Sequence, residues 1–442
     1  MQLSPSLTAY LALAVPMIVS NITTPLLGIV DTSILGHLPH AYLLAGVALA
    51  NTVITAVVWL FGFLRMSTTG LTAQAIGKNN PLQTSQLLVQ GLSIAIGVSL
   101  ALLILQPWIL QGALWFAEAD AQVNQAASEY FFIRFQALPA SLINLVLVGW
   151  LLAHGKTKAI MLTQIAINLV NVILDLILVF VFDLAVKGVA WASLAAEYTG
   201  LVIYLLIAFK LIVTTNLHRS IHHSFVHLSK INFRQFLAVN RDILIRTLTL
   251  ECALVFLTFQ GARIGVDVLA ANALLMNFLM LISLGLDGIA YAAEVQIGKT
   301  FGANDKTKLK QNIMLGMNLS LALAAVYSLV FLWFDQHIIG LMTDIQSIKT
   351  AALAFSFYII ILPLTAVWCF LLDGVFIGLA DSKSMRNSML MSVVGVFFPV
   401  WYTANYLAEI HSYNPNHALW IALHAMMLTR GITLARKITL YI

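Results

Sequence analysis

Long apolar stretches follow one another along the whole chain, separated by short polar connections. A helix needs about 20 apolar residues to cross the hydrocarbon core of a bilayer. Twelve stretches approach or exceed this length, at 9–35, 42–67, 86–107, 129–153, 159–182, 188–210, 242–261, 268–295, 312–334, 352–378, 386–408 and 417–439. We therefore expect an all-α polytopic membrane protein with twelve transmembrane helices. No basic residue precedes the first stretch and no small-residue cleavage site follows it, so we expect a span rather than a signal peptide.

The composition excludes the main alternatives to a membrane protein. Only 9% of the residues are charged and 60% are hydrophobic, whereas soluble domains carry about 25% charged residues. The same numbers exclude intrinsic disorder. Two cysteines, Cys252 and Cys369, both within apolar runs, exclude a disulfide scaffold. The net charge of +5 does not indicate a nucleic-acid partner, because membrane proteins gather basic residues in cytoplasmic loops.

The basic residues predict the orientation of the chain. If the N-terminus is inside, sixteen Lys and Arg residues lie in the even-numbered loops and the C-terminal end. The odd-numbered loops then hold only Lys187, Arg263 and Lys349. Positive residues concentrate on the cytoplasmic side of membrane proteins. We therefore expect both termini to be cytoplasmic.

An internal repeat divides the chain into two halves. The segment LLAGVALANT from Leu43 matches VLAANALLMN from Val268, and other matching segments follow at nearly the same shift along the chain. Each half has six spans, so both enter the membrane in the same direction, as in many secondary transporters. We expect an N-terminal lobe at 1–210, a basic cytoplasmic linker at 211–241 and a C-terminal lobe at 242–442.

The expected linker is rich in histidine, with His218, His222, His223 and His227. A metal site or a pH sensor is one interpretation of these residues. Their spacing matches no defined metal motif. A solvated connection between the halves is therefore the preferred interpretation, and no metal site is predicted.

Polar residues inside two apolar helices of the first half are the strongest functional signal. One set follows helical spacing on the first span: Asn21, Thr24, Gly28 and Asp31. A second set lies on the fifth span: Gln164, Asn168, Asn171 and Asp175. A polar stripe on an apolar helix cannot face lipid, so the two stripes are expected to meet inside one lobe. Buried carboxylates of this kind can exchange protons near physiological pH. A hydrogen-bond network that only holds helices together is the alternative, and for Glu197 in the sixth span it is preferred.

Two prolines, Pro16 and Pro25, lie in the first span. Each removes a backbone hydrogen bond and permits a kink. A helix that can bend and carries a titratable Asp31 suggests a hinge whose bending follows protonation. A static kink that serves packing is the alternative.

Acidic residues of the second half form a rival cluster. Glu251 lies in the seventh span, Asp287 in the eighth and Asp373 in the tenth. Ionisable residues at membrane depth are costly and mark functional sites. This cluster is a candidate site for Na⁺ or for a cationic substrate, with interhelical hydrogen bonding as the alternative. Arg65, Arg134 and Arg246 lie near span ends, where long basic side chains can snorkel to the interface.

The sequence resembles the multidrug and toxic compound extrusion (MATE) family, in its DinF-like branch. The resemblance covers essentially the whole chain. It depends on VDTSILGHL around Asp31, NVILD at 171–175, NRDILIRTL from Asn240 and GARIGVDVLAANALLMNFL from Gly261. It implies two six-helix lobes arranged as a V, alternating access, and export of organic cations and amphipathic drugs driven by H⁺ or Na⁺. It also implies a bacterial cytoplasmic membrane location.

The resemblance further implies roles for individual residues. Asp31, Asn171 and Asp175 match a proton-coupling network of the N-terminal lobe, to which the stripe residue Asn168 is added, and Ser193 stands where the family most often has Thr. The family's hinge proline matches Pro16 best. In a branch resembling NorM, the cation-site acids correspond to Glu251 and Asp373. We expect H⁺ as the coupling ion, because the match in the N-terminal lobe is the closer one.

Other functions fit the sequence less well. A flippase for lipid-linked oligosaccharides, from a related superfamily, needs a strongly cationic cavity, whereas the charges at mid-membrane are mostly acidic. An intramembrane enzyme is not expected, since no HExxH or GxSxG motif occurs. A channel lacks a filter-like repeat. We expect a monomer that contacts membrane lipids and small-molecule drugs, with no cofactor and no nucleic acid.

Overall fold

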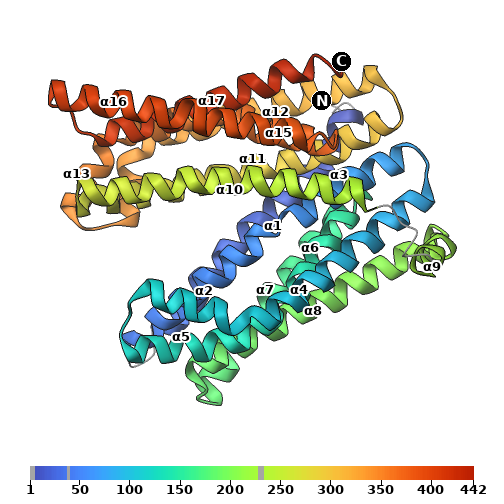
Figure 1. The fold of residues 1–442 in the computed structure, drawn as a ribbon, viewed down its shortest axis with the longest axis horizontal. Coiled ribbons are helices and arrows are strands. Elements are labelled where there is room, and N and C mark those ends of the chain that lie inside the picture. The colour runs from blue at the N-terminus through green and yellow to red at the C-terminus, as the bar shows by residue number, and fades with distance from the viewer. Residues whose placement is uncertain (1–4, 37–39, 227–232) are drawn as a thin grey trace. The chain divides into compact units, whose positions relative to one another are not determined.

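The computed structural model describes the backbone of residues 5–36, 40–226 and 233–442. It describes their side chains except at residues 5, 24–32, 35–36 and 225–226. Within these ranges the regular structure is helical throughout, and no strand occurs (Figure 1). The all-α fold that the apolar stretches predict is therefore confirmed.

The helices follow one another with short connections. The first part of the chain contains α1 (Pro5–Gly36), α2 (Ala41–Leu60), α3 (Phe63–Gly77), α4 (Pro81–Ala117), α5 (Ala121–Arg134), η1 (Phe135–Ala137), α6 (Leu138–Ala153), α7 (Thr157–Leu176), η2 (Ile177–Val181), α8 (Ala185–Thr214) and α9 (His218–Val226). The second part contains α10 (Arg234–Ile264), α11 (Val266–Gly302), α12 (Lys306–Met342), α13 (Gln346–Ala354), α14 (Ser356–Gly378), α15 (Ser382–Ser392), η4 (Val393–Phe397), α16 (Phe398–His411) and α17 (Asn416–Ile438).

The long helices match the expected spans. Among the described residues, 11 helical segments are long and apolar enough to cross a membrane. The expected seventh span is not among them, yet it lies within α10, a helix of 31 residues. The first half of α10 carries charged residues, among them Arg241, Asp242 and Arg246. Asp242 and Arg246 form ion pairs with residues of other helices.

Large apolar side chains cover the outside of several helices. Ile104 and Trp108 of α4 are 70% and 63% exposed, and Trp333 of α12 is 71% exposed. Soluble proteins rarely expose extended apolar surface of this kind. In a bilayer these side chains contact lipid tails, so the surface and the helix lengths together indicate a multi-pass integral membrane protein.

The described helices form two compact units. Unit 1 consists of Met1–Ile18 and Ala238–Ile442, and unit 2 consists of Val19–Leu237. The units differ from the expected lobes at the first helix. The start of α1 packs with the C-terminal half of the chain: Ile18 lies against Gly288 of α11, and Tyr10 lies against Gly316 of α12.

One helix forms the centre of each unit. In unit 2, α6 packs against α3, α4 and α8, and in unit 1, α14 packs against α11, α12 and α17. The side chains of α6 are mostly buried, including Trp150, which is fully buried. Most side chains of α14 are buried as well. Because other helices surround α6 and α14, the long apolar runs of these two helices are buried inside their units.

The two units repeat the same local structure at the shift expected from the sequence. Helices α4 and α12 are both 37 residues long, and their first residues, Pro81 and Lys306, are related by the same shift as Leu43 and Val268. Asn80 caps α4 by accepting a hydrogen bond from the backbone N–H of Gln83 at 3.0 Å. Asp305 caps α12 in the same way through Lys308, also at 3.0 Å. A capping side chain satisfies an amide that the helix leaves unbonded. The repeat thus extends to the capping of its helices.

Close helix packing repeats in the same way. A Cβ atom at Gly149 of α6 would lie 2.5 Å from the backbone oxygen of Arg65 in α3. A Cβ atom at Gly374 of α14 would lie 2.9 Å from the carbonyl carbon of Ala290 in α11. The shift that relates the two helix starts also relates these two contacts, residue by residue. Each unit therefore uses a glycine to bring its central helix against the backbone of a neighbour.

Candidate functional site

A chain of polar contacts joins helix α7 to helix α1 within unit 2. Gln164 Nε2 donates to Asn168 Oδ1 at 3.1 Å. Asn168 Nδ2 in turn donates to the backbone carbonyl of Thr23 at 3.0 Å. Thr23 lies two residues before Pro25, in the part of α1 where the proline weakens the backbone hydrogen bonding. The polar stripe of the fifth span thus contacts the backbone of the first span, although the two are 145 residues apart.

The same stripe continues into the interior of unit 2. Asn171 Nδ2 donates to Ser193 Oγ of α8 at 3.1 Å. One turn further along α7, Asp175 is completely buried. Asn171 is 1% exposed and Ser193 is 7% exposed. The structure therefore brings Asn171 and Ser193 together and places a carboxylate beside them in sequence, away from the surface.

The remaining expected residues of this site lie in α1. Pro16 is buried and belongs to the part of α1 that packs in unit 1. The backbone at Asp31 and Pro25 is helical and belongs to unit 2. Their side chains lie outside the described residues. The hinge role of the prolines and the coupling role of Asp31 stay predictions.

A second polar group in unit 2 surrounds Glu197 of α8. Arg134 Nη2 at the end of α5 lies 3.4 Å from Glu197 Oε1. Asn144 Nδ2 of α6 donates to the Glu197 carbonyl oxygen at 3.2 Å and to Oε2 at 3.4 Å. Glu197 thus connects helices α5, α6 and α8. This agrees with the interhelical hydrogen-bond network that is the preferred interpretation of Glu197 in the sequence. The sequence predicts only snorkelling for Arg134 and no partner, because a pairing over 63 residues leaves no spacing signal.

In unit 1, Asp373 of α14 pairs with two arginines. Its Oδ2 accepts hydrogen bonds from Arg246 of α10 and from Arg430 of α17. Asp287 of α11 is half-buried and interacts electrostatically with both arginines. Glu251 of α10 is half-buried, and no ion pair or hydrogen bond of its side chain is found among the described residues. The candidate acids Asp287 and Asp373 therefore lie near the same two arginines, Arg246 and Arg430.

The arginines change the expectation for this region. Arg246 was expected to snorkel towards the interface, but it is 9% exposed and pairs inside unit 1. The spacing of the acids does not reveal Arg430, although an arginine in the middle of the apolar stretch 417–439 is a signal by itself. It is 4% exposed. The sequence therefore indicates the acids of this region but not the arginine that pairs with Asp373 from α17.

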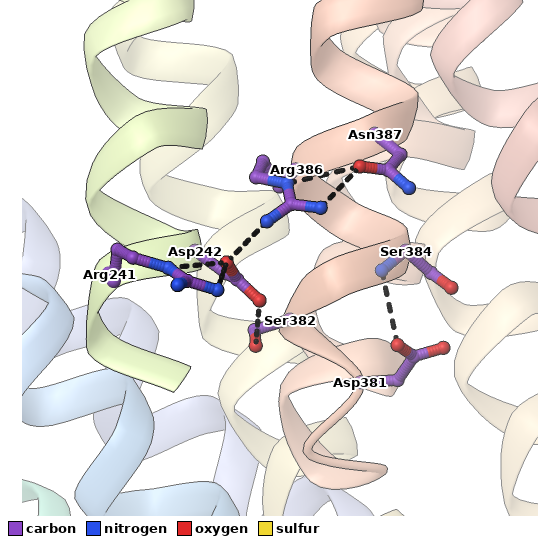
Figure 2. A network of polar contacts seen from close by, with 7 residues as sticks. All are labelled: Arg241, Asp242, Asp381, Ser382, Ser384, Arg386 and Asn387. Atoms are coloured by element: carbon purple, nitrogen blue, oxygen red, sulfur yellow. Dashed lines mark hydrogen bonds and ion pairs between the residues drawn. The ribbon is translucent and has the colours of Figure 1, made fainter. Parts of the chain in front are cut away.

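Charged residues also join helices at one end of unit 1 (Figure 2). Asp242, about two turns into α10, accepts a hydrogen bond from Arg386 Nη1 of α15 at 2.7 Å and one from Arg241 Nη2 at 3.1 Å. Ser382 Oγ lies 3.4 Å from the other oxygen of Asp242. Next to them, Asp381 caps α15 through the N–H of Ser384. We interpret this group as structural, because every charge in it has a partner.

The described residues contain no group of three or more His, Cys, Asp or Glu side chains arranged to hold a metal ion. His218, His222 and His223 lie on or at the start of the short helix α9, and His227 lies outside the described residues. Both expected sites are therefore built from amides, hydroxyls, carboxylates and guanidinium groups. Such groups can bind a proton or an ionic substrate.

Comparison with known proteins identifies relatives over the whole chain. The sequence profile of the MatE family matches residues 16–177 and 243–403. The chain is 40% identical to DNA damage-inducible protein F of Escherichia coli, over 96% of this chain and 90% of the relative. It is 23% identical to the probable multidrug resistance protein NorM of Bacillus cereus, over 95% and 92%. A crystal structure of a MATE protein in complex with MaD3S has the same fold, with a TM-score of 0.85, 18% identity and coverage of 99% and 96%.

Proposed function

The chain belongs to the MatE family, and from that premise we propose that it is a secondary active multidrug efflux antiporter. It exports organic cations and amphipathic drugs in exchange for H⁺, by alternating access. The names of relatives such as the probable multidrug resistance protein NorM support drug export. The function is transport, so no chemical step on the substrate and no cofactor is required. We place it in the bacterial cytoplasmic membrane as a monomer, with both termini in the cytoplasm.

The observation that carries the proposal is the buried polar chain of unit 2. Asp175 is an acid without surface exposure, on the same helix face as Asn171 and Asn168. Burial makes the charged form of a carboxylate costly. Whether the carboxylate carries a proton therefore strongly affects the free energy of the site around it. A helix that carries this acid and also holds the backbone of α1 can convert protonation into movement.

The coupling runs from α7 to α1 in this proposal. Asn168 donates to the Thr23 carbonyl, next to Pro25. Pro25 has no N–H to donate to the carbonyl of Asn21, so this turn of α1 has fewer backbone hydrogen bonds than an ordinary helical turn. A change in the hydrogen bonds of the stripe therefore alters how α1 is held near its proline. Protonation of Asp31 and Asp175 then competes with substrate binding, because a proton and a substrate favour different states of the same network.

The pairing of Asp373 supports H⁺ over Na⁺ as the coupling ion. A Na⁺ site needs several oxygen ligands that are free to face the cation. One oxygen of Asp373 already accepts from Arg246 and Arg430. Two guanidinium groups at this carboxylate repel a further cation. The acids of the C-terminal half are therefore the weaker candidates for a cation site.

Ethidium transport by the purified protein in proteoliposomes tests the function and the ion together. An imposed proton gradient is expected to drive ethidium against its concentration gradient, and an imposed Na⁺ gradient without a proton gradient is expected to drive none. Transport driven only by Na⁺ would overturn proton coupling. Transport driven by neither gradient would overturn the antiporter proposal.

Substitutions connect the assay to the site. Asp175→Asn is expected to lose proton-driven ethidium transport but to keep ethidium binding, because the amide removes the titratable proton and preserves the shape. Asp31→Asn should behave alike. Asp120→Asn is the matched control, since Asp120 is exposed in a connection and its side chain makes no capping bond. Unchanged proton-driven transport by Asp175→Asn and Asp31→Asn would refute the coupling role.

Flipping of lipid-linked oligosaccharides is the second candidate. Buried Arg246 and Arg430 are the observation that favours it, because a pyrophosphate needs basic partners. Asp373 and the nearby Asp287 offset this charge, which is why export of drugs is the preferred proposal. Translocation of a fluorescent lipid pyrophosphate in the same proteoliposomes, without ethidium transport, would reverse this order.

A further inference from the structure

Two arginines share a single carboxylate oxygen inside unit 1. Arg246 comes from α10, Arg430 from α17 and Asp373 from α14. Their side chains are 11%, 5% and 12% exposed. Both ion pairs end on Asp373 Oδ2. The group therefore brings two positive charges to one carboxylate oxygen at a buried position, where charge is costly.

The hydrogen bonds of this group are incomplete. The Nε atoms of Arg246 and Arg430 and Oδ1 of Asp373 are buried, and no hydrogen-bond partner for them is found in the part of the chain that the structure describes. Buried polar groups in proteins are nearly always bonded to protein, water or ligand. A guanidinium has five N–H donors in a planar fork that matches a carboxylate. The unmet donors outnumber the unmet acceptor, so the group can bind a further acceptor, and a carboxylate fits the fork of a guanidinium.

Apolar, polarisable side chains pack beside this group. The thiol of Cys369 lies in the field of both arginines, and its Sγ lies 3.4 Å from Met427 Sδ. Soft, polarisable side chains of this kind adapt to varied apolar shapes. Asp287 is the further acid whose charge acts on the two arginines. It moderates the positive charge of the group and can itself face a cationic part of a substrate.

We propose that Arg246 and Arg430 form a binding site for the carboxylate of an amphipathic substrate, with Asp373 as their internal counter-ion between substrates. The substrate carboxylate accepts hydrogen bonds from the guanidinium groups while Asp373 gives up part of its contact with them. The chain then handles acidic and zwitterionic amphiphiles as well as the organic cations of the proposed function. This inference rests on the proposed transport function.

The alternative is that the three side chains only hold α10, α14 and α17 together. The two roles predict different signs for substitutions. If the group only joins helices, removal of any member weakens the fold and affects all ligands alike. If it is an anion site, removal of an arginine weakens the binding of an anion, whereas removal of the Asp373 charge strengthens it.

Equilibrium binding to the full-length protein in a neutral detergent distinguishes these roles. The probes are a dansyl-labelled fatty acid and its primary amide, which has the same shape without the charge. The wild type is expected to bind the carboxylate more tightly than the amide. Arg430→Gln is expected to weaken carboxylate binding by about tenfold or more, which corresponds to the loss of one charge-assisted contact. Amide binding should change little. Asp373→Asn should tighten carboxylate binding.

Several outcomes would overturn the proposal. One is equal affinity of the wild type for the two probes. Another is a parallel loss of both probes in Arg430→Gln, and a third is weaker carboxylate binding in Asp373→Asn. Arg430→Lys keeps the charge and should retain most of the preference, which separates charge from packing. If Arg430→Gln does not fold, the comparison of probes in the wild type and in Asp373→Asn still decides. No ion gradient enters this assay, so its failure is distinguishable from failure of proton-driven export.

Discussion

Replacement of Gly149 by alanine tests the packing on which the central helix of unit 2 depends. A Cβ atom at this position would lie 2.5 Å from the backbone oxygen of Arg65 and 3.2 Å from its Cα. Ordinary contacts begin near 3.4 Å, so α6 and α3 would have to separate by ~0.9 Å. The nearest atoms belong to backbone and cannot rotate away. Forced overpacking of this kind costs about 1–3 kcal/mol.

The matched control is Gly97→Ala in α4. A Cβ atom at Gly97 meets nothing within 4 Å. Alanine favours the helix over glycine by about 1 kcal/mol at both positions. The difference in unfolding free energy between the two variants therefore cancels this preference and leaves the clash, about 1–3 kcal/mol. Gly374→Ala, the repeat counterpart, should be destabilised to a similar extent.

Two measurements on purified protein check the prediction. Denaturation with SDS, followed by tryptophan fluorescence, gives the difference in unfolding free energy between the variants. Thermal unfolding gives the order of stability independently. If Gly149→Ala is as stable as Gly97→Ala, the close approach of α6 to α3 does not exist. If Gly374→Ala alone is destabilised, the packing is not repeated between the units.

Further predictions concern the polar ends of helices in unit 1. Arg386→Gln removes the arginine that lies 2.7 Å from buried Asp242, and we expect a loss of about 1.5–3 kcal/mol in unfolding free energy in the same SDS titration. Unchanged stability would contradict a structural role. The N–H of Lys308 and then its ammonium lower the pKa of Asp305, so this cap stabilises the fold above the ordinary carboxyl range and loses its effect as the pH falls through the lowered pKa. The thermal stability gap between wild type and Asp305→Ala should therefore shrink in acid, whereas the gap for Asn80→Ala, whose cap is an amide, should remain constant.

The sequence predicts most of the helices, because apolar runs of membrane length have few alternatives. Their ends are less predictable. The third expected span is 86–107, but α4 begins at Pro81, since Asn80 caps it before the apolar run begins, and the helix continues to Ala117. The α10 helix is a similar case: its apolar stretch begins at residue 242, yet the helix begins at Arg234. Helix caps and polar helical turns leave no hydrophobic signal.

The candidate site was predictable where its residues share one helix. Helical spacing places Asn168, Asn171 and Asp175 on one face, and the structure confirms that they lie on α7 with Asn171 against Ser193. Pairings between residues of different helices are not predictable in this way. Asp373 and Arg430 are 57 residues apart, and nothing in their spacing indicates contact. Such pairs depend on how helices pack, which a single sequence does not encode locally.

The first helix is shared between the two units, and this has a consequence for the duplication behind the repeat. The part of α1 that ends at Ile18 belongs to unit 1, where Tyr10 and Ile18 fill the space left by glycines of α12 and α11. A separate half packed as unit 1 is could not complete itself and would need this segment from a second copy, as in a swapped dimer. A fragment of the present chain that begins within the linker should accordingly need the N-terminal fragment in order to fold, because only the N-terminal fragment carries the part of α1 that completes unit 1.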